Sequence, residues 1–150
     1  MAYWLMKSEP HAFSIDDLKA VRRNSWDGVR NYQARNMMRD DMKKGDLAFF
    51  YHSNCKEPGV VGVMKICREA YPDNIEFGRK GKKVKVNADP DNPTWLMVDV
   101  QYQRKLKRNI TLKELRTHPV LGDLALLRKG NRLSVMPVSE EHWDYILGLE

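Results

Sequence analysis

Hydrophobic and polar residues alternate along several short stretches of the chain, which is the pattern of half-buried β-strands. Residues 46–52 alternate in this way, and so do residues 95–103. Residues 60–67 are apolar on both faces, so we expect them to form a central strand of a sheet. Shorter strands are expected near the two ends of the chain, over residues 3–7 and 132–138.

Short helices are expected between these strands and after the last one. Ser14 with Asp17, and Thr111 with Glu114, have the three-residue spacing of a capping box, which marks the start of a helix. Apolar residues recur every fourth position after residue 31, and Gly45 ends that helical pattern. The expected helices cover residues 14–21, residues 31–43, a short segment from residue 112, residues 121–127 and a terminal segment capped by Ser139.

The order of these elements predicts an α+β fold. Strands outnumber long helices, and the helices are short insertions, which favours a small curved or closed sheet with helices around its rim. The chain has 150 residues and no internal repeat or low-complexity linker, so a single domain over residues 1–150 is expected. Residues 77–93 are the most loop-like part, because glycines, prolines and lysines are concentrated there.

The charge balance points to a polyanionic partner. The chain has 26 Lys and Arg residues against 20 Asp and Glu residues, a formal net charge of +6. A basic surface attracts nucleic acid, and counterion release then adds affinity that does not depend on sequence. Compact basic clusters occur at residues 79–83, which include Lys82 and Lys83, and at residues 104–108. A run of charge is also typical of an ordinary solvated face, so both interpretations stay open.

Catalytic and metal-binding motifs are absent from the sequence. Its four histidines are scattered, and no phosphate-binding loop, nucleophile elbow or zinc spacing occurs. His52 and Cys55 are three residues apart, which on a strand places the two side chains on opposite faces. We therefore expect a protein that is not an enzyme and that needs no metal ion and no cofactor.

Cysteine content and hydropathy indicate where such a protein works. Cys55 and Cys67 are too few for a disulfide framework, which is typical of a reduced cytosolic chain. No apolar run approaches the roughly 20 residues that span a membrane, and the first residues do not resemble a signal peptide. We expect a cytoplasmic location and no membrane partner.

Aromatic, amide and guanidinium side chains are concentrated in residues 24–36. Trp26 stands in a polar stretch, residues 24–28, that we expect to be a loop. Arg30, Asn31 and Tyr32 follow within a few residues. Aromatic rings stack on bases, amides pair with base edges and Arg pairs with phosphate. The alternative is structural, with Asn31 capping a helix and Trp26 covering the edge of the core.

Two more polar pairs follow expected strands. Ser8 and Glu9 come after the first strand, and Ser53 and Asn54 come after the strand at residues 46–52. If these strands are neighbours, both pairs lie at the same end of the sheet beside Trp26. The alternative is two ordinary turns, in which Ser and Asn are common.

Several longer motifs resemble EVE-domain proteins, a group that includes the thymocyte nuclear protein family. The resemblance covers nearly the whole chain in the expected order, and the string from Gly28 to Asn36 is highly specific. The matching segments are residues 4–10 (WLMKSEP), 26–36 (WDGVRNYQARN), 45–46 with 49–54, 69–73 (EAYPD), 95 with 98–100, and 132–135 with 137–138.

The resemblance implies a PUA-like fold, a small β pseudo-barrel surrounded by short helices and similar in plan to YTH domains. It also implies a nucleic-acid-binding module that holds a flipped-out, modified base in an aromatic pocket, with methylated or hydroxymethylated cytosine as the expected base. Trp26 would be a stacking wall and Tyr32 a second aromatic. The full set of expected base-binding residues is Ser8, Glu9, Trp26, Arg30, Asn31, Tyr32, Ser53 and Asn54, and the expected phosphate contacts are Arg132, Lys82 and Lys83.

The expected partner is DNA or RNA that carries a modified base, and a nuclease or another effector is a possible second partner. Two alternatives remain at this stage. One is an RNA-binding PUA-like module, because no residue reports on a 2′-hydroxyl. The other is an enzyme acting on a modified base or nucleotide, for which Glu9 is the candidate acid or base.

Overall fold

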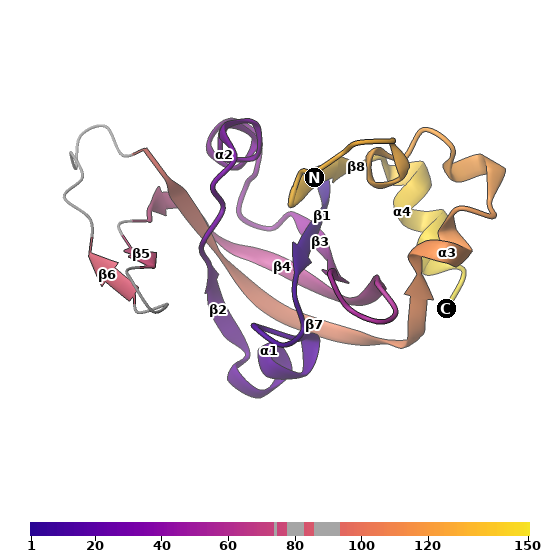
Figure 1. Cartoon of the computed structure of the whole chain (residues 1–150), viewed down its shortest axis with the longest axis horizontal. Helices are drawn as coiled ribbons and strands as arrows, with labels where there is room; N and C mark the ends of the chain where they lie inside the picture. The colour runs from indigo at the N-terminus through magenta and orange to yellow at the C-terminus, as the bar shows by residue number, and fades with distance from the viewer. Residues whose placement is uncertain (74, 78–82, 86–93) are drawn as a thin grey trace.

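Six strands form one mixed sheet in the computed structural model, which describes residues 1–73, 75–77, 83–85 and 94–150 (Figure 1). The order across the sheet is β2-β7-β4-β3-β1-β8. Only β1 and β3 run parallel, and the other neighbours are antiparallel. The strands are β1 (Tyr3–Ser8), β2 (Arg23–Trp26), β3 (Leu47–His52), β4 (Gly59–Pro72), β7 (Leu96–Thr111) and β8 (Val135–Val138).

Helices and a small ribbon complete the described fold. Two short strands, β5 (Ile75–Phe77) and β6 (Lys83–Lys85), pair with each other, and only their backbone is described. The helices are α1 (Ile15–Val21), α2 (Tyr32–Asp40), α3 (Leu112–Leu115) and α4 (Glu140–Leu147), with 3-10 turns η2 (Pro119–Leu121) and η3 (Ala125–Leu127). No helix in the described part is long and apolar enough to cross a membrane.

Two hydrophobic clusters cover the two faces of the sheet. Phe50 belongs to the cluster that includes apolar residues of α1 and α2, whereas its neighbour Phe49 belongs to the cluster that includes residues of α3 and α4. Successive strand residues point to opposite faces, so β3 supplies both clusters. The expectation of a half-buried strand at residues 46–52 is therefore wrong, since the four central residues of β3 are all buried.

The α+β class is confirmed, and the sheet is open. Edge strands β2 and β8 each pair with one neighbour among the described residues, so hydrogen bonding does not close the sheet into a barrel. The expected central strand at residues 60–67 is confirmed as part of β4, which pairs with β3 on one side and β7 on the other. Register shifts along the β4–β7 pair bend both strands.

Several expected boundaries shift in the structure. The helix expected over residues 31–43 ends at Asp40. Strand β7 extends to Thr111 because its pairing with β4 continues as far as that residue. The last strand begins at Val135 and not at residue 132. Both capping boxes are helix starts: Ser14 accepts a hydrogen bond from Asp17 N, and Thr111 accepts one from Glu114 N.

Candidate nucleic-acid interface

The ends of β1 and β3 bring the two predicted polar pairs together. Ser8 lies opposite His52 in the parallel register, and Ser53 N donates to the Ser8 carbonyl at 3.0 Å. Asn54 Nδ2 donates to Glu9 Oε1 at 3.1 Å. The four residues therefore form one polar rim, as expected if the two strands are neighbours.

A pocket of about 470 Å³ opens beside this rim, between the end of β1 and the edge strand β2, and we call it the Trp26 pocket. Ser8 lies on one wall and Trp26 on the other, so the structure joins two of the expected base-binding residues. The lining residues are Lys7, Ser8, Ala12, Phe13, Asn24, Ser25, Trp26 and Asp27.

Trp26 lies in a strand, so the expected loop over residues 24–28 is wrong for residues 24–26 and holds for residues 27–28. Asn24 pairs with Val100 and Trp26 with Val98, which makes this polar stretch the edge of the sheet. The Trp26 ring is only 6% exposed and meets Phe50 edge-on, with ring centroids 5.2 Å apart. Trp26 thus covers the edge of the core and also lines the pocket, so both sequence interpretations describe part of its environment.

Asp73, which the sequence analysis did not single out, fixes the segment that follows Trp26. Its buried carboxylate accepts hydrogen bonds from Gly28 N at 2.9 Å and from Arg30 Nη1 at 3.0 Å. Gly28 has a φ of +80°, which side chains rarely allow. The motif at residues 69–73 ends in this aspartate, and that was the only indication in the sequence. Asp73 thus anchors the segment directly after residues 24–27, which line the Trp26 pocket.

Six of the eight expected base-binding residues do not line the Trp26 pocket: Glu9, Arg30, Asn31, Tyr32, Ser53 and Asn54. Asn31 accepts a hydrogen bond from Ala34 N at 3.0 Å and so caps α2. Tyr32 stacks on Trp95 with ring centroids 4.9 Å apart, and the Arg35 guanidinium lies 4.8 Å from the Tyr32 ring. Arg30 is held by Asp73. Contacts with Trp95 and Asp73, which sequence order does not reveal, direct Tyr32 and Arg30 elsewhere. Asn31 instead makes the local capping bond that was its alternative role.

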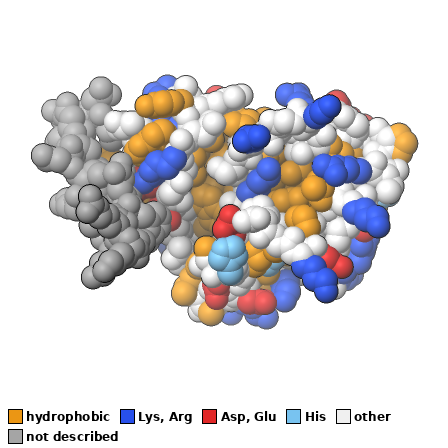
Figure 2. All heavy atoms as spheres, in the orientation of Figure 1, with side chains coloured by type: hydrophobic (Ala, Val, Ile, Leu, Met, Phe, Trp, Pro, Cys, Tyr) orange, Lys and Arg blue, Asp and Glu red, His pale blue; other side chains and the backbone are white. Residues whose placement is uncertain are grey.

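Arg132 lies in a second hollow, of about 340 Å³, between α2 and the segment that precedes β8; we call it the Arg132 hollow. Arg132 was expected on the last strand, but Asn131 bridges Ala125 O and Leu133 N and keeps this segment outside the sheet. In space-filling view, Lys and Arg side chains recur over this face (Figure 2). The lining residues are Asn31, Gln33, Ala125, Arg128, Lys129, Gly130, Asn131, Arg132 and Leu133.

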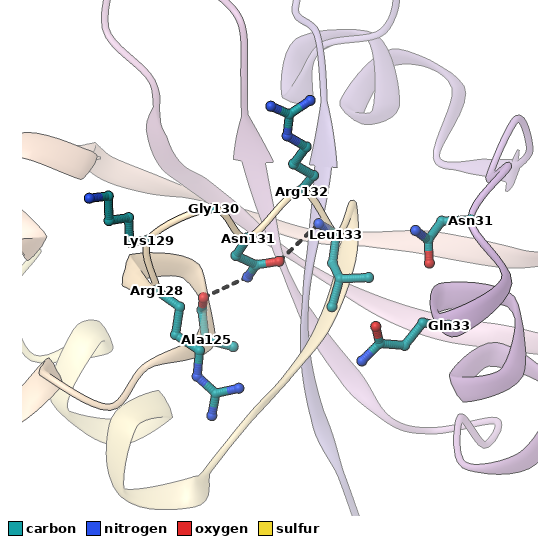
Figure 3. Close-up of a pocket in the computed structure, with 9 residues that line it drawn as sticks. All are labelled: Asn31, Gln33, Ala125, Arg128, Lys129, Gly130, Asn131, Arg132 and Leu133. Carbon is teal, nitrogen blue, oxygen red and sulfur yellow. Dashed lines mark hydrogen bonds between the residues drawn. The ribbon is translucent and has the colours of Figure 1, made fainter.

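The Arg132 hollow and the Trp26 pocket have linked walls. Lys7 N, in the wall of the Trp26 pocket, donates to the Ser134 carbonyl at 2.8 Å, next to Leu133. Figure 3 shows the amides of Asn31 and Gln33 on the α2 side, across from Leu133. The two cavities are therefore connected through β1 and the segment that precedes β8.

The basic tract at residues 104–108 is largely neutralised within the fold. Arg104 is paired with Glu150, Lys105 with Asp16 at 2.9 Å, and Arg108 with Glu114 at 2.6 Å. In contrast, Arg128, Lys129 and Arg132 form no ion pair with any described residue. Lys82 lies outside the described residues, and Lys83 lies in β6, where only the backbone is described.

Lys7 is a further cation at the Trp26 pocket that the sequence analysis did not identify. Its ammonium lies 6.0 Å from the centroid of the Tyr51 ring, and burial lowers the pKa of Lys7. The position directly before Ser8 in the WLMKSEP motif was its only sequence indication. The ammonium therefore lies beside Tyr51, on the sheet face opposite to Phe50 and Trp26, although Lys7 is among the residues that line the Trp26 pocket.

His52 serves the fold rather than chemistry. Its Nε2 accepts a hydrogen bond from Ile15 N at 3.1 Å, which requires the neutral ring. Burial lowers the pKa of His52 from 6.5, Lys105 acts in the same direction, and Asp16 and Asp17 oppose it. Among the described residues no group of three or more His, Cys, Asp or Glu side chains is arranged to hold a metal ion.

The lowered pKa of His52 predicts a pH dependence of stability. The unfolded state takes up a proton near pH 6.5 and the folded state only at lower pH, so this contribution is present above pH 6.5 and is lost as the pH falls. We expect the free energy of unfolding, measured in urea, to decrease below pH 6.5. His52→Gln should lose less stability over that range, whereas exposed His11→Gln should behave like the wild type; equal pH profiles for all three proteins would contradict the assignment.

Comparisons with known proteins agree with this architecture. A model of the EVE domain matches residues 2–149. Thymocyte nuclear protein 1 of Mus musculus is 49% identical over 167 residues, which cover 99% of this chain and 73% of the relative. The Homo sapiens protein of that name is 47% identical over 168 residues, covering 99% of this chain and 74% of the relative.

Two crystal structures share the fold over almost their full length. A protein from Pseudomonas syringae has a TM-score of 0.90 and 46% identity, covering 99% of both chains. Human THYN1 protein, crystallised in complex with DNA that contains 5-methylcytosine, has a TM-score of 0.86 and 47% identity, covering 99% of this chain and 97% of that chain. On this sequence and structural agreement, the chain belongs to the EVE domain family.

Proposed function

We propose that this protein is a reader of modified DNA, which holds a flipped-out 5-modified cytosine in the Trp26 pocket. The observation that carries the proposal is the lining of this pocket, where the aromatic residues Trp26 and Phe13 face polar groups next to a hollow of unpaired cations. The human relative crystallised with 5-methylcytosine DNA supports the choice of ligand.

The lining suits a cytosine with an added methyl group. Aromatic faces stack on a base, worth roughly 1–3 kcal/mol in single-strand binders. The Asp27 carboxylate can accept a hydrogen bond from the cytosine amino group, the pairing that acidic side chains make with this base. A methyl group at C5 replaces water against the apolar wall, whereas plain cytosine leaves that space to be hydrated. Discrimination then comes from the fit of the base, and general affinity from the cations.

The position of Glu9 favours a reader over an enzyme. Its carboxylate is 44% exposed, accepts from Asn54 and lies 3.0 Å from His11 Nε2, and it is not among the residues that line the Trp26 pocket. A general acid or base must reach the reacting group directly or through one water. We therefore propose binding without catalysis, and expect Glu9→Gln to leave base binding largely intact.

RNA, a nuclease and other effectors remain candidate partners of the same surface. Neither cavity contains a feature that selects for or against a 2′-hydroxyl, so RNA is included in the experiment below. The cytoplasmic location stays a prediction, and the name thymocyte nuclear protein 1 refers to the nucleus for the animal relatives.

The test is a binding titration near physiological salt against matched DNA and RNA oligonucleotides with plain, methylated or hydroxymethylated cytosine, or methylated adenine. We expect at least a tenfold preference for a modified cytosine in DNA, about 1.4 kcal/mol. Ser8→Leu, which enlarges a lining side chain on the sheet face that carries Trp26, should abolish this preference and keep weak, salt-sensitive binding. The matched control is Gln33→Leu in the Arg132 hollow, and this variant should keep the preference for modified cytosine. Equal affinities of the wild type for all oligonucleotides would refute the proposal.

A further inference from the structure

A third cavity, of about 510 Å³, lies between the β3–β4 connection and α3, and we call it the α3 hollow. Its apolar part is formed by Pro58 and Leu112, and the Leu112 amide donates to the Pro58 carbonyl at 2.8 Å. Asn109 Nδ2 also donates to the Glu57 carbonyl at 2.9 Å. These bonds hold the connection against α3. The lining residues are Lys56, Glu57, Pro58, Thr111, Leu112, Lys113 and Arg116.

The α3 hollow carries an excess of positive charge. Lys56, Lys113 and Arg116 are exposed, and none of them forms an ion pair within the described part of the chain. Glu57 is the one acid in the lining, and the nearby Glu114 is already held by Arg108. Three cations against one acid therefore surround a cavity with apolar walls.

The α3 hollow is continuous with the polar rim of the proposed site. The β3–β4 connection starts at Ser53 and Asn54 in that rim and reaches Lys56 two residues later. In Figure 1 this connection and α3 lie to the right of β1. On the same side of Figure 2, blue Lys and Arg side chains outnumber red acidic ones. Cations without acidic partners among the described residues thus occur in both the Arg132 hollow and the α3 hollow.

We propose that the α3 hollow binds the phosphodiester backbone of nucleotides that flank the flipped base, where the β3–β4 connection leads away from the polar rim. The inference rests on the proposed function, and it names the second surface over which the same DNA runs. Phosphates neutralise cations that the fold leaves unpaired, and Pro58 and Leu112 offer apolar contact to the deoxyribose. In this arrangement the DNA backbone runs along the β3–β4 connection and α3. The basic tract at residues 104–108 takes no part in binding it.

The test compares two triple variants that lose the same charge. Lys56→Gln with Lys113→Gln and Arg116→Gln empties the α3 hollow of cations. Lys19→Gln with Lys44→Gln and Lys65→Gln removes three exposed lysines that line neither the α3 hollow nor the two cavities of the proposed site. Each protein is titrated with plain and methylated duplexes of decreasing length, at several salt concentrations.

The α3-hollow variant should lose affinity for long duplexes on the order of tenfold or more, and its salt slope should fall by about 1 per lost phosphate contact. Its ratio of affinities for methylated and plain DNA should not change. The control should keep most of the affinity, and short duplexes should bind the α3-hollow variant and wild type alike. Equal losses in both triple variants, or an unchanged slope in the α3-hollow variant, would overturn the inference. The proposed function is judged separately, by the wild-type preference for the modified base.

Discussion

Replacing Trp26 with Ala is expected to lower the free energy of unfolding by about 3–5 kcal/mol and to abolish the preference for a modified base. The stability loss follows from burial, because the ring is 6% exposed and packs edge-on against Phe50 in the core cluster. The loss of preference follows from the pocket, because removal of the indole removes an aromatic part of its lining. Urea unfolding measures the first effect, and titration with matched plain and methylated duplexes measures the second.

Trp26→Phe separates these two effects. Phe keeps an aromatic face and much of the buried volume, so the variant should fold with a smaller stability loss and retain part of the preference. The DNA titrations of Trp26→Ala and Trp26→Phe are done at a temperature where urea unfolding shows each variant to be folded. A folded Trp26→Ala protein with undiminished discrimination would show that Trp26 belongs only to the core.

Replacing Asp46 with Ala is expected to lower the free energy of unfolding by about 3 kcal/mol and to leave base preference intact in the folded protein. The Asp46 side chain is buried and accepts three hydrogen bonds, from Ala2 N at 3.1 Å, Trp4 Nε1 at 3.0 Å and Lys43 N at 2.9 Å. Its loss leaves these donors without their acceptor at the start of β1 and β3. The Trp26 pocket lies at the opposite ends of these strands.

Two companion variants sharpen this test. Asp46→Asn keeps one carbonyl oxygen and turns the second acceptor into a donor, so it should lose an intermediate amount of stability. Asp144→Ala changes an exposed carboxylate on α4 and should stay within about 0.5 kcal/mol of wild type. If Asp46→Ala were as stable as Asp144→Ala, the three hydrogen bonds would not matter to the fold. If it lost base preference while folded, the two ends of the sheet would be coupled.

Local chemistry explains which elements were predictable. Ser14 and Thr111 cap helices through bonds to residues three positions later, so their spacing in the sequence is sufficient to find them. The apolar run within β4 likewise reports burial on both faces directly. The end of α2 and the start of β8 were placed wrongly, because partners distant in sequence, or a side-chain bridge such as that of Asn131, determine them.

The sequence by itself determined the α+β class, the helix starts and the family resemblance. These features depend on residue type, short spacing or ordered motifs, whereas the parallel pairing of β1 with β3 decided that the Ser8 and Ser53 pairs are neighbours. Only the tertiary structure decided that Trp26 lies on an edge strand beside Ser8, since β2 becomes a strand by pairing with β7 some 70 residues away. The tertiary structure also decided which charges are available. Arg104 and Arg108 are paired with Glu150 and Glu114, whereas the cations around the three cavities form no ion pair with a described residue. Ion pairing depends on distances in space, which the linear order of charges does not contain.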